Sequence, residues 1–355
     1  MRAGFDEEER ALLEGFDETL RRLPEYATAV DDGRVDREVV SRLGRRLAAD
    51  GWFEVADPRS DSRQPGTVLA GLAEVAGRRS VAIPYPLLET WLAVRVLRQA
   101  GAEEVATAVA AGERTATLAV DLLGGNHVGD TSGWVPYANA ADLAVLVVAE
   151  GAETTVLLAE LPLASMWEAP AIDLATPTGV APLPVGREAG RLDSEELRFT
   201  RCLYLALQAA AMVGAADDLF RRTVDYLRAR EQFGVRLSSF QALQHHAADL
   251  LVALEAARSL AYYAAWCADA RAERMEEYAL TAKGFCGETC WSIAGSAIQL
   301  HGGTGMTWEG ALHYGLCRIA YLAMAGRNAS ECLSAAGGAA IDRASMLTLA
   351  HRRGP

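Results

Sequence analysis

Apolar residues recur with the spacing of a helix through most of this chain, which predicts a largely helical protein. On the first expected helix, Leu12, Phe16 and Leu20 lie on one face. In the first third of the chain, helices are expected over residues 5–23, 36–49, 69–77 and 87–99, with a short one before Gly112.

From Thr115 the pattern changes to short alternating runs, which are typical of strands. Strands are expected at residues 115–120, 143–148 and 154–158, with prolines in the turns that follow. Beyond about Asp193 the helical period returns, over residues 195–230, 240–270, 276–300, 312–324 and 329–349. Helices this long with wide apolar faces predict an up-and-down bundle. Small residues at 209–211 and 214–216 should let its helices approach closely.

These patterns predict an α+β fold that is mainly α, in three domains. An N-terminal helical domain is expected over residues 1–114, a reduced β domain over 115–192 and a C-terminal helical bundle over 193–355.

Composition favours a globular protein, because 51% of the 355 residues are hydrophobic and 23% are charged. The net charge of −13 repels nucleic acid and anionic membrane, so neither is expected as a partner. No apolar run of membrane-spanning length and no signal peptide are recognised, so a cytoplasmic protein is expected. The six cysteines include no Cys-x-x-Cys pair, and no histidine lies near Cys286 and Cys290. Buried free thiols are therefore expected, and no metal site.

The segment Arg230-Glu231-Gln232-Phe233-Gly234 carries the first candidate chemistry. It lies late in a helical run, and Gly234, which is free to take positive φ, is expected to end that helix. A second helix is expected to start near Ser238 and Ser239, whose hydroxyls suit an N-cap, and it carries Gln241. A guanidinium fork and an amide on either side of a tight turn can hold a pyrophosphate.

A later segment, Gln299-Leu300-His301-Gly302-Gly303-Thr304-Gly305, offers bare backbone N–H groups that an anionic ligand can approach. Taken alone, Arg230 would be a solvated cation at a helix end, Gln241 an exposed polar residue and the Gly-Gly pair a simple loop. Their order and spacing together favour a cofactor site.

With these segments the chain resembles the acyl-CoA dehydrogenases, flavoenzymes that remove two hydrogens from the α and β carbons of acyl-CoA thioesters. The resemblance implies their fold, with an N-terminal helical domain, a small middle β-barrel domain, shortened here, and a C-terminal four-helix bundle that forms dimers and tetramers. It implies FAD as the cofactor, with its ADP half held by groups from two subunits. The matching residues are Arg230, Gln232, Phe233, Gln241, Gln299, Gly302 and Gly303.

The β domain departs from the family at the flavin ring. The family has a Thr-Glu and then a Gly-Ser-Asp in the first loop of the barrel, whereas this chain reads Ala-Val-Asp-Leu-Leu-Gly-Gly over residues 119–125. Residues that would bond the polar edge of the isoalloxazine ring are not recognised there.

Dehydrogenation also needs a carboxylate close to the substrate α carbon. In the family this Glu follows a late arginine, where this chain has Ala325 or Arg327 after Arg318. Alternatively it lies in the helix before the Arg-x-Gln-Phe-Gly segment, where this chain has Tyr204. A tyrosine is a poor base because its reference pKa is near ~10.

Glu309 and Glu331 are weak substitutes for this base. Glu309 is expected to order a turn, and Glu331 to cap the last helix. No catalytic residue is therefore assigned from the sequence.

The function predicted from the resemblance is a partner subunit of a heteromeric α2β2 acyl-CoA dehydrogenase that acts on a bulky CoA thioester, such as a steroid side-chain intermediate. This chain would help to bind FAD and shape the acyl pocket, and the partner would supply the catalytic Glu. One alternative is a self-sufficient homomeric flavoenzyme with a displaced base. Another is a structural pseudoenzyme that binds no FAD.

Overall fold

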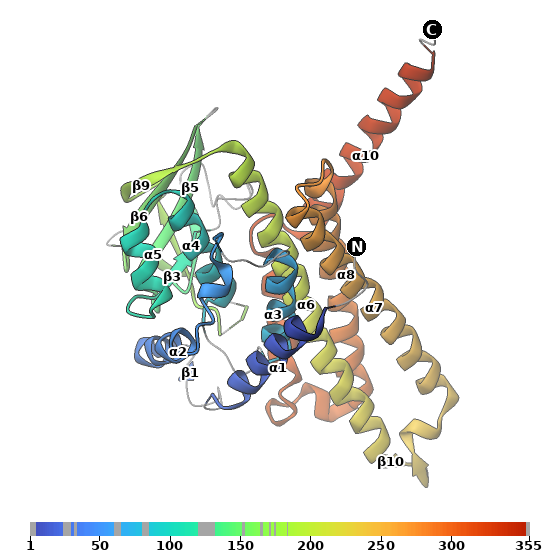
Figure 1. Ribbon diagram of the computed structural model, residues 1–355. Coiled ribbons are helices and arrows are strands. Elements are labelled where there is room, and N and C mark those ends of the chain that lie inside the picture. Colours follow the sequence, from blue (N-terminus) through green and yellow to red (C-terminus); the bar gives the residue numbers. More distant parts are fainter. Residues whose placement is uncertain are drawn as a thin grey trace.

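The computed structural model describes residues 5–23, 30–31, 34–59, 65–79, 85–119, 132–150, 153–163, 166–169, 172–173, 175–182 and 184–352. Long helices run side by side through one half of the molecule, and the N-terminal helices and strands lie beside them (Figure 1). The last helix, α10 (Ala329–Arg352), projects from the end opposite to strand β10 (Glu231–Gln232).

The N-terminal part contains the helices that its apolar periodicity predicts. Its elements are α1 (Glu7–Arg21), β1 (Val30–Asp31), β2 (Arg34–Val35), α2 (Arg37–Ala49), the 3-10 turn η2 (Glu54–Ala56), α3 (Pro65–Arg78), α4 (Leu87–Gln99) and α5 (Glu103–Ala110). α1 begins with a capping box, in which Asp6 and Glu9 each donate a backbone N–H to the other's carboxylate (2.9 Å each). α3 starts before its expected first residue, at Pro65, because proline suits the first position of a helix.

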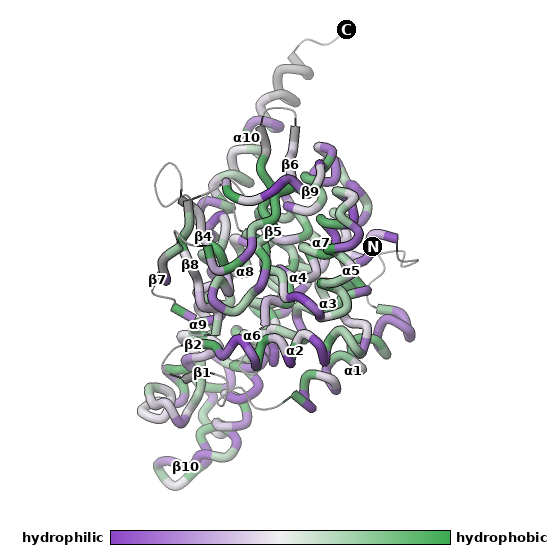
Figure 2. The backbone as a smooth tube through the Cα atoms, turned by 90° about the vertical axis from the view of Figure 1, so that its left-hand side faces the viewer, coloured by the Kyte–Doolittle hydropathy of each residue, from purple (hydrophilic) through white to green (hydrophobic). Residues whose placement is uncertain are grey.

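The middle part forms two small sheets with strand orders β3-β5-β6-β9 and β4-β8-β7. The strands are β3 (Ala116–Leu118), β4 (Ser132–Pro136), β5 (Leu143–Glu150), β6 (Glu153–Glu160), β7 (Trp167–Ala169), β8 (Thr178–Pro182) and β9 (Arg187–Leu192). β3 pairs with β5 in parallel, and the other pairs in these sheets are antiparallel. The three expected strands are β3, β5 and β6, and Figure 2 shows β5 as a strongly hydrophobic stretch.

The C-terminal part is helical, as expected. It comprises α6 (Ser194–Ala229), β10, β11 (Val235–Arg236), η5 (Leu237–Ser239), α7 (Gln241–Asp269), α8 (Met275–His301), η6 (Gly302–Met306), η7 (Trp308–Gly310), α9 (Leu312–Met324) and α10. α9 has the expected ends, and those of α6, α7 and α8 differ from expectation by one residue.

α6 passes through the core. Among the described residues, α6 is the one helix that is both long enough and apolar enough to cross a membrane. Its mean hydropathy is 1.3 over an 18-residue window, and 94% of that window is buried. The expectation that no apolar run reaches this length was wrong. The burial of that window is typical of a core helix, whose apolar residues pack against the protein itself.

α3 packs closely on α6 at two glycines. A Cβ atom at Gly214 would lie 1.9 Å from the carbonyl oxygen of Glu74, and one at Gly77 would lie 2.0 Å from that of Ala211. Side chains larger than hydrogen are therefore excluded at both positions. The predicted role of the small residues near position 214 is confirmed.

Polar contacts also fix the N-terminal helices on the bundle. The carboxylate of Asp269, at the end of α7, accepts hydrogen bonds from the backbone N–H groups of Gly66 and Thr67 (2.8 Å each). These N–H groups belong to the first turn of α3 and have no partner within that helix. Asp269 of α7 therefore caps the start of α3. In a second contact, buried Arg95 pairs with Glu196 of α6 at 2.7 Å.

All six cysteines are free, and Cys317 alone among them is not fully buried. In the part of the chain that the structure describes, no three His, Cys, Asp or Glu side chains are grouped to hold a metal ion.

Candidate functional site

Residues 230–236 form a tight hairpin. α6 ends at Ala229, and β10 pairs with β11 across a turn made by Phe233 and Gly234. Both turn residues take left-handed conformations, with φ of 57° and 81°, as a type I′ turn requires. The expectation that Gly234 ends the helix was wrong, because Gly234 instead closes the hairpin.

The next helix starts without a serine cap. Phe240 is the N-cap residue of α7 and makes no side-chain capping bond. The hydroxyl of Ser239 donates to the carbonyl of Arg236 (2.7 Å) and so stabilises the 3-10 turn. The expected N-cap at Ser238 or Ser239 is therefore corrected, and α7 begins at Gln241.

The polar residues predicted to bind the cofactor at this hairpin lie at the surface. Arg230, Gln232 and Gln241 are all exposed. No carboxylate among the described residues forms an ion pair with Arg230. Phe233 is 91% exposed, and its ring meets that of Phe240 edge to face at 6.3 Å between centroids. An unpaired cation beside exposed aromatic rings is typical of a surface that contacts another molecule.

The second predicted segment ends α8. Gly302 takes a φ of 58°, and its N–H donates to the carbonyl of Gln299. A Cβ atom at Gly302 or Gly303 would meet no atom within 4 Å. The backbone is therefore open to an approaching ligand at this point, and the side chain of Gln299 is exposed beside it.

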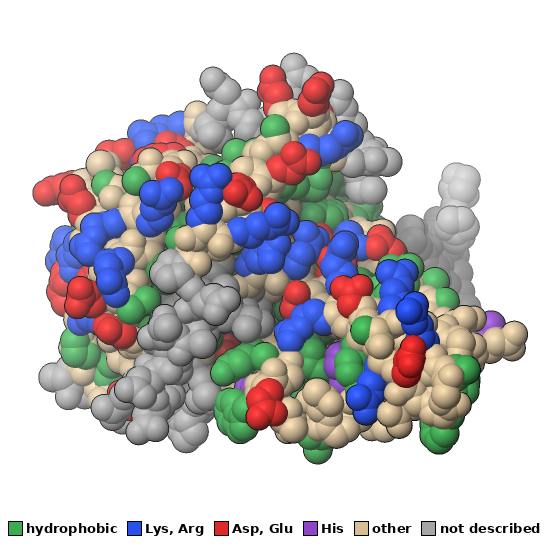
Figure 3. Space-filling view, turned by 90° about the horizontal axis from the view of Figure 1, so that it is seen from below, with side chains coloured by type: hydrophobic (Ala, Val, Ile, Leu, Met, Phe, Trp, Pro, Cys, Tyr) green, Lys and Arg blue, Asp and Glu red, His purple; other side chains and the backbone are tan. Residues whose placement is uncertain are grey.

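The structure brings both segments to the same end of the bundle. The ring of His301 stacks on Tyr226 of α6, with 4.3 Å between centroids. The carbonyl of Tyr226 accepts the backbone N–H of Arg230 (2.8 Å), one helical turn further on. Figure 3 looks at this end and shows arginine side chains in a band across the face, with apolar side chains beside them.

The positions expected to carry a catalytic carboxylate hold other residues. Tyr204 is completely buried in α6. Ala325 is buried at the C-terminal end of α9, and Arg327 is half-buried in the loop before α10.

The two weak substitutes lie elsewhere. Glu309 is exposed in η7. Glu331 donates its N–H to the side chain of Asn328 (2.9 Å), and its carboxylate accepts the N–H of Asn328 (3.2 Å). This reciprocal pair caps the start of α10, so the expected capping role of Glu331 is confirmed.

Sequence reasoning missed a buried carboxyl group, Glu89 of α4, which is 5% exposed. The hydroxyl of Tyr204 donates a hydrogen bond to Glu89 Oε1 at 3.2 Å. Burial raises the pKa of Glu89, and its own backbone N–H, the Tyr204 hydroxyl and Arg318 act in the opposite direction. Burial and the neighbouring Glu89 also hold the pKa of Tyr204 well above its ordinary value.

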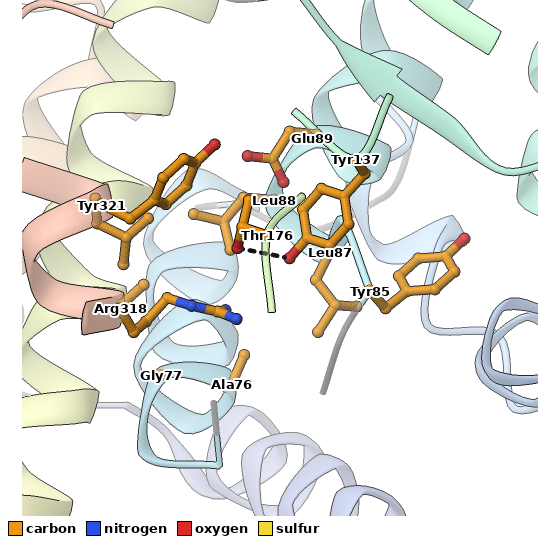
Figure 4. Close-up of a pocket in the computed structure, with 12 residues that line it drawn as sticks. Ala76, Gly77, Tyr85, Leu87, Leu88, Glu89, Tyr137, Thr176, Arg318 and Tyr321 are labelled. Carbon is orange, nitrogen blue, oxygen red and sulfur yellow. Dashed lines mark hydrogen bonds between the residues drawn. The ribbon is translucent and has the colours of Figure 1, made fainter. Parts of the chain in front are cut away.

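Glu89 lines a cavity of about 30 Å³, which is room for about one or two water molecules. Figure 4 shows the carboxyl group between Tyr321 and Tyr137 in this view. The hydroxyl groups of Tyr137 and Thr176 share a hydrogen bond (3.3 Å), and Arg318 pairs with Asp173. The polar lining is made by Tyr85, Glu89, Tyr137, Thr176, Arg318 and Tyr321.

One sequence signal could have revealed this cavity. Glu89 is the one acidic residue in the apolar helix Leu87–Gln99. A carboxylate in such a helix is rarely buried without a partner, so it marks a polar contact in the core. The segment expected at the flavin ring lies mostly outside the described residues, at 120–125.

Residues 205–326 match the family model described as acyl-CoA dehydrogenase, C-terminal domain. The acyl-CoA dehydrogenase IpdE2 of Mycobacterium tuberculosis is 31% identical over 240 residues, which are 65% of this chain and 65% of that protein. IpdE2 of Mycolicibacterium smegmatis is 29% identical over 231 residues, 64% of each chain. The chain thus matches somewhat less than two thirds of the length of these curated relatives.

Solved structures with the same fold match nearly the whole chain. A variant of the Tcur3481-Tcur3483 steroid ACAD has a TM-score of 0.79 and 24% identity, over 96% of this chain and 99% of that one. The ChsE4-ChsE5 complex from Mycobacterium tuberculosis has a TM-score of 0.75 and 20% identity, over 95% and 98%. The predicted fold, with its helical N-terminal part, small β part and helical bundle, is confirmed.

Proposed function

We propose that this chain is a subunit of a flavin-dependent acyl-CoA dehydrogenase, because residues 205–326 match the C-terminal domain of that family and the chain shares its fold with a steroid ACAD. In this role the bundle, within residues 193–355, helps to hold FAD at the boundary with a second, related subunit of an α2β2 assembly in the cytoplasm. Residues 1–114 and 115–192 shape the acyl site. The partner's site supplies the glutamate base, and the substrate is a bulky acyl-CoA thioester such as a steroid side-chain intermediate.

The observation that carries this proposal is the exposed, unpaired guanidinium of Arg230 at the hairpin. Its planar donors fit a diphosphate, and the amide of Gln241 adds a neutral donor. Gln299, Gly302 and Gly303 present further exposed polar groups at the same end of the bundle. This donor set fits the ADP half of FAD, a cofactor on which acyl-CoA dehydrogenases depend. When bound, FAD supplies the acceptor for the hydride that leaves the substrate β carbon.

Two observations support a role beside a partner. Large apolar side chains are exposed at the same end, with Met306 82%, Trp308 69% and Phe233 91% accessible, as expected of a surface that another subunit covers. In addition, neither Tyr204 nor Ala325 is an acid, so the two family positions for the base supply none here.

The visible absorption spectrum tests the proposal. The chain is purified alone and also through an affinity tag from its own host, with whatever subunit accompanies it. We expect flavin bands in the assembly and none in the lone chain. An assembly without flavin, or a lone chain with stoichiometric flavin, contradicts the subunit role.

We expect Arg230→Ala to weaken FAD binding of the assembly by about tenfold or more, since a charge-assisted bond to a diphosphate is lost. The measurement is the flavin content after dialysis against decreasing FAD concentrations. Arg228→Ala is the matched control, because Arg228 is also exposed on the last turn of α6. Equal flavin retention in the two variants would show that Arg230 has no cofactor role.

A further inference from the structure

The cavity beside Glu89 lies where three parts of the chain meet. Glu89 comes from α4, Tyr204 from α6, and Arg318 and Tyr321 from α9. Tyr137, directly after β4, adds a wall from the β region, as Figure 4 shows. A carboxyl group is thus brought against Tyr204, the residue that occupies an expected base position.

We infer that Glu89 is the carboxylate base of this chain's own cavity and that Tyr204 positions it. The inference rests on the proposed function for its substrate, a CoA thioester. It goes beyond that function, because the assembly then carries a base in this subunit as well as in the partner. In the step concerned, the α C–H bond of the thioester breaks, the proton passes to a Glu89 oxygen and the electron pair remains on the thioester enolate.

The environment of Glu89 suits this step. A base works best with a pKa near the working pH, and burial raises the pKa of Glu89 in that direction. The hydroxyl of Tyr204 and the charge of Arg318 favour the ionised form and so limit the rise. Tyr137 and Tyr321 face the same space and carry no charge at neutral pH.

Other carboxylates near the cavity are committed to other partners. Asp173 pairs with Arg318 and accepts a hydrogen bond from the hydroxyl of Thr176 (3.0 Å). Glu89 accepts one from Tyr204 and forms no ion pair among the described residues. The cavity of about 30 Å³ is too small for an acyl group. Access of a thioester to Glu89 therefore requires side chains that line the cavity to move aside.

A mechanism-based probe tests the inference residue by residue. Removal of an α-proton from 3-pentynoyl-CoA, with return of a proton at the γ carbon, gives an allenic thioester. A carboxylate adds to its β carbon and forms an ester. The assembly, purified through a tag on this chain, is treated with the probe, and the modified peptides are identified by mass spectrometry.

We expect an adduct on the peptide that carries Glu89 and none on this chain in Glu89→Gln, which keeps the size of the side chain. Glu104→Gln, an exposed change at the start of α5, is the control and should be labelled like the wild type. If the assembly holds flavin but Glu89 is never modified, the inference fails while the proposed function stands. If flavin is absent, it is the proposed function that fails.

Tyr204→Phe gives a second readout, which also decides the question if Glu89→Gln does not fold. The change removes a donor that stabilises the ionised carboxylate, so the pKa of Glu89 should rise. The pH at which labelling reaches half its maximal rate should then move up by about one unit. An unchanged pH profile contradicts the positioning role of Tyr204.

Discussion

Gly214→Ala is expected to lower the free energy of unfolding by about 3 kcal/mol. The new Cβ atom would lie 1.9 Å from the carbonyl oxygen of Glu74 and 2.7 Å from the backbone nitrogen of Arg78. Both are backbone atoms of α3, so relief requires the two helices to move apart. Since the core around them is tightly packed, that movement separates buried surfaces as well. Urea unfolding of the isolated chain, followed by circular dichroism, measures the loss.

Gly295→Ala is the matched control for this prediction. Gly295 lies inside α8, and a Cβ atom there would meet nothing within 4 Å. Alanine should therefore stabilise the chain by about 0.5–1 kcal/mol through its better helix propensity. If the two substitutions change the stability by similar amounts, the close approach of α3 to α6 is wrong.

The helices could be predicted from the sequence because their signals are local. α4 and α9 have the expected ends, since periodic apolar residues stop where the helix stops. β9 was not predicted, because five of its six residues are exposed or half-buried and show no apolar alternation. The wrongly expected helix end at Gly234 shows a second limit of prediction from local sequence. Glycine signals a positive φ, but the residues around it do not distinguish a helix end from a hairpin.

The expected cofactor site at the end of the bundle and the cavity beside Glu89 differ in how far the sequence could predict them. Arg230 and Gly302 lie in short segments whose order and spacing could be recognised. Tyr204 could be placed by counting along one helix. The contact of Tyr204 with Glu89 joins residues 115 positions apart, and no local pattern encodes such a pairing. Glu89 could be noted as an acid in an apolar helix, but the packing of α4 against α6 is needed to identify Tyr204 as its partner.

Lys283 is the single lysine of the chain, and it is completely buried in α8. Its ammonium group donates to the side-chain oxygen of Gln208 (2.6 Å), to the carbonyl of Ala325 (3.1 Å) and to that of Leu322. A compact ammonium with three donors fits these acceptors, whereas the planar fork of arginine does not. Lys283 thus holds the C-terminal end of α9 in place.

We expect Lys283 to give the chain an unusual pH dependence of stability. Burial lowers the pKa of Lys283 to about 7, from an ordinary value of 10.5. Between these values the unfolded chain binds the proton and the folded chain does not. The free energy of unfolding should therefore rise with pH across this window, by at most about 1.4 kcal/mol per unit. Below pH 7 Lys283 is protonated in both the folded and the unfolded chain, so burial of its charge lowers the free energy of unfolding by the full amount.

Because there is one lysine, nuclear magnetic resonance of the chain labelled with ¹⁵N-lysine should show one side-chain signal, whose titration gives the pKa directly. We expect a midpoint near 7, and loss of the alkaline rise in stability in Lys283→Met. Lys283→Arg, which keeps a charge, should destabilise the chain at every pH because the larger guanidinium does not fit the three acceptors. A lysine that titrates near 10.5 would mean that the three acceptors offset the whole cost of burial. The cation would then hold the end of α9 at every physiological pH, with no loss of charge as the pH rises.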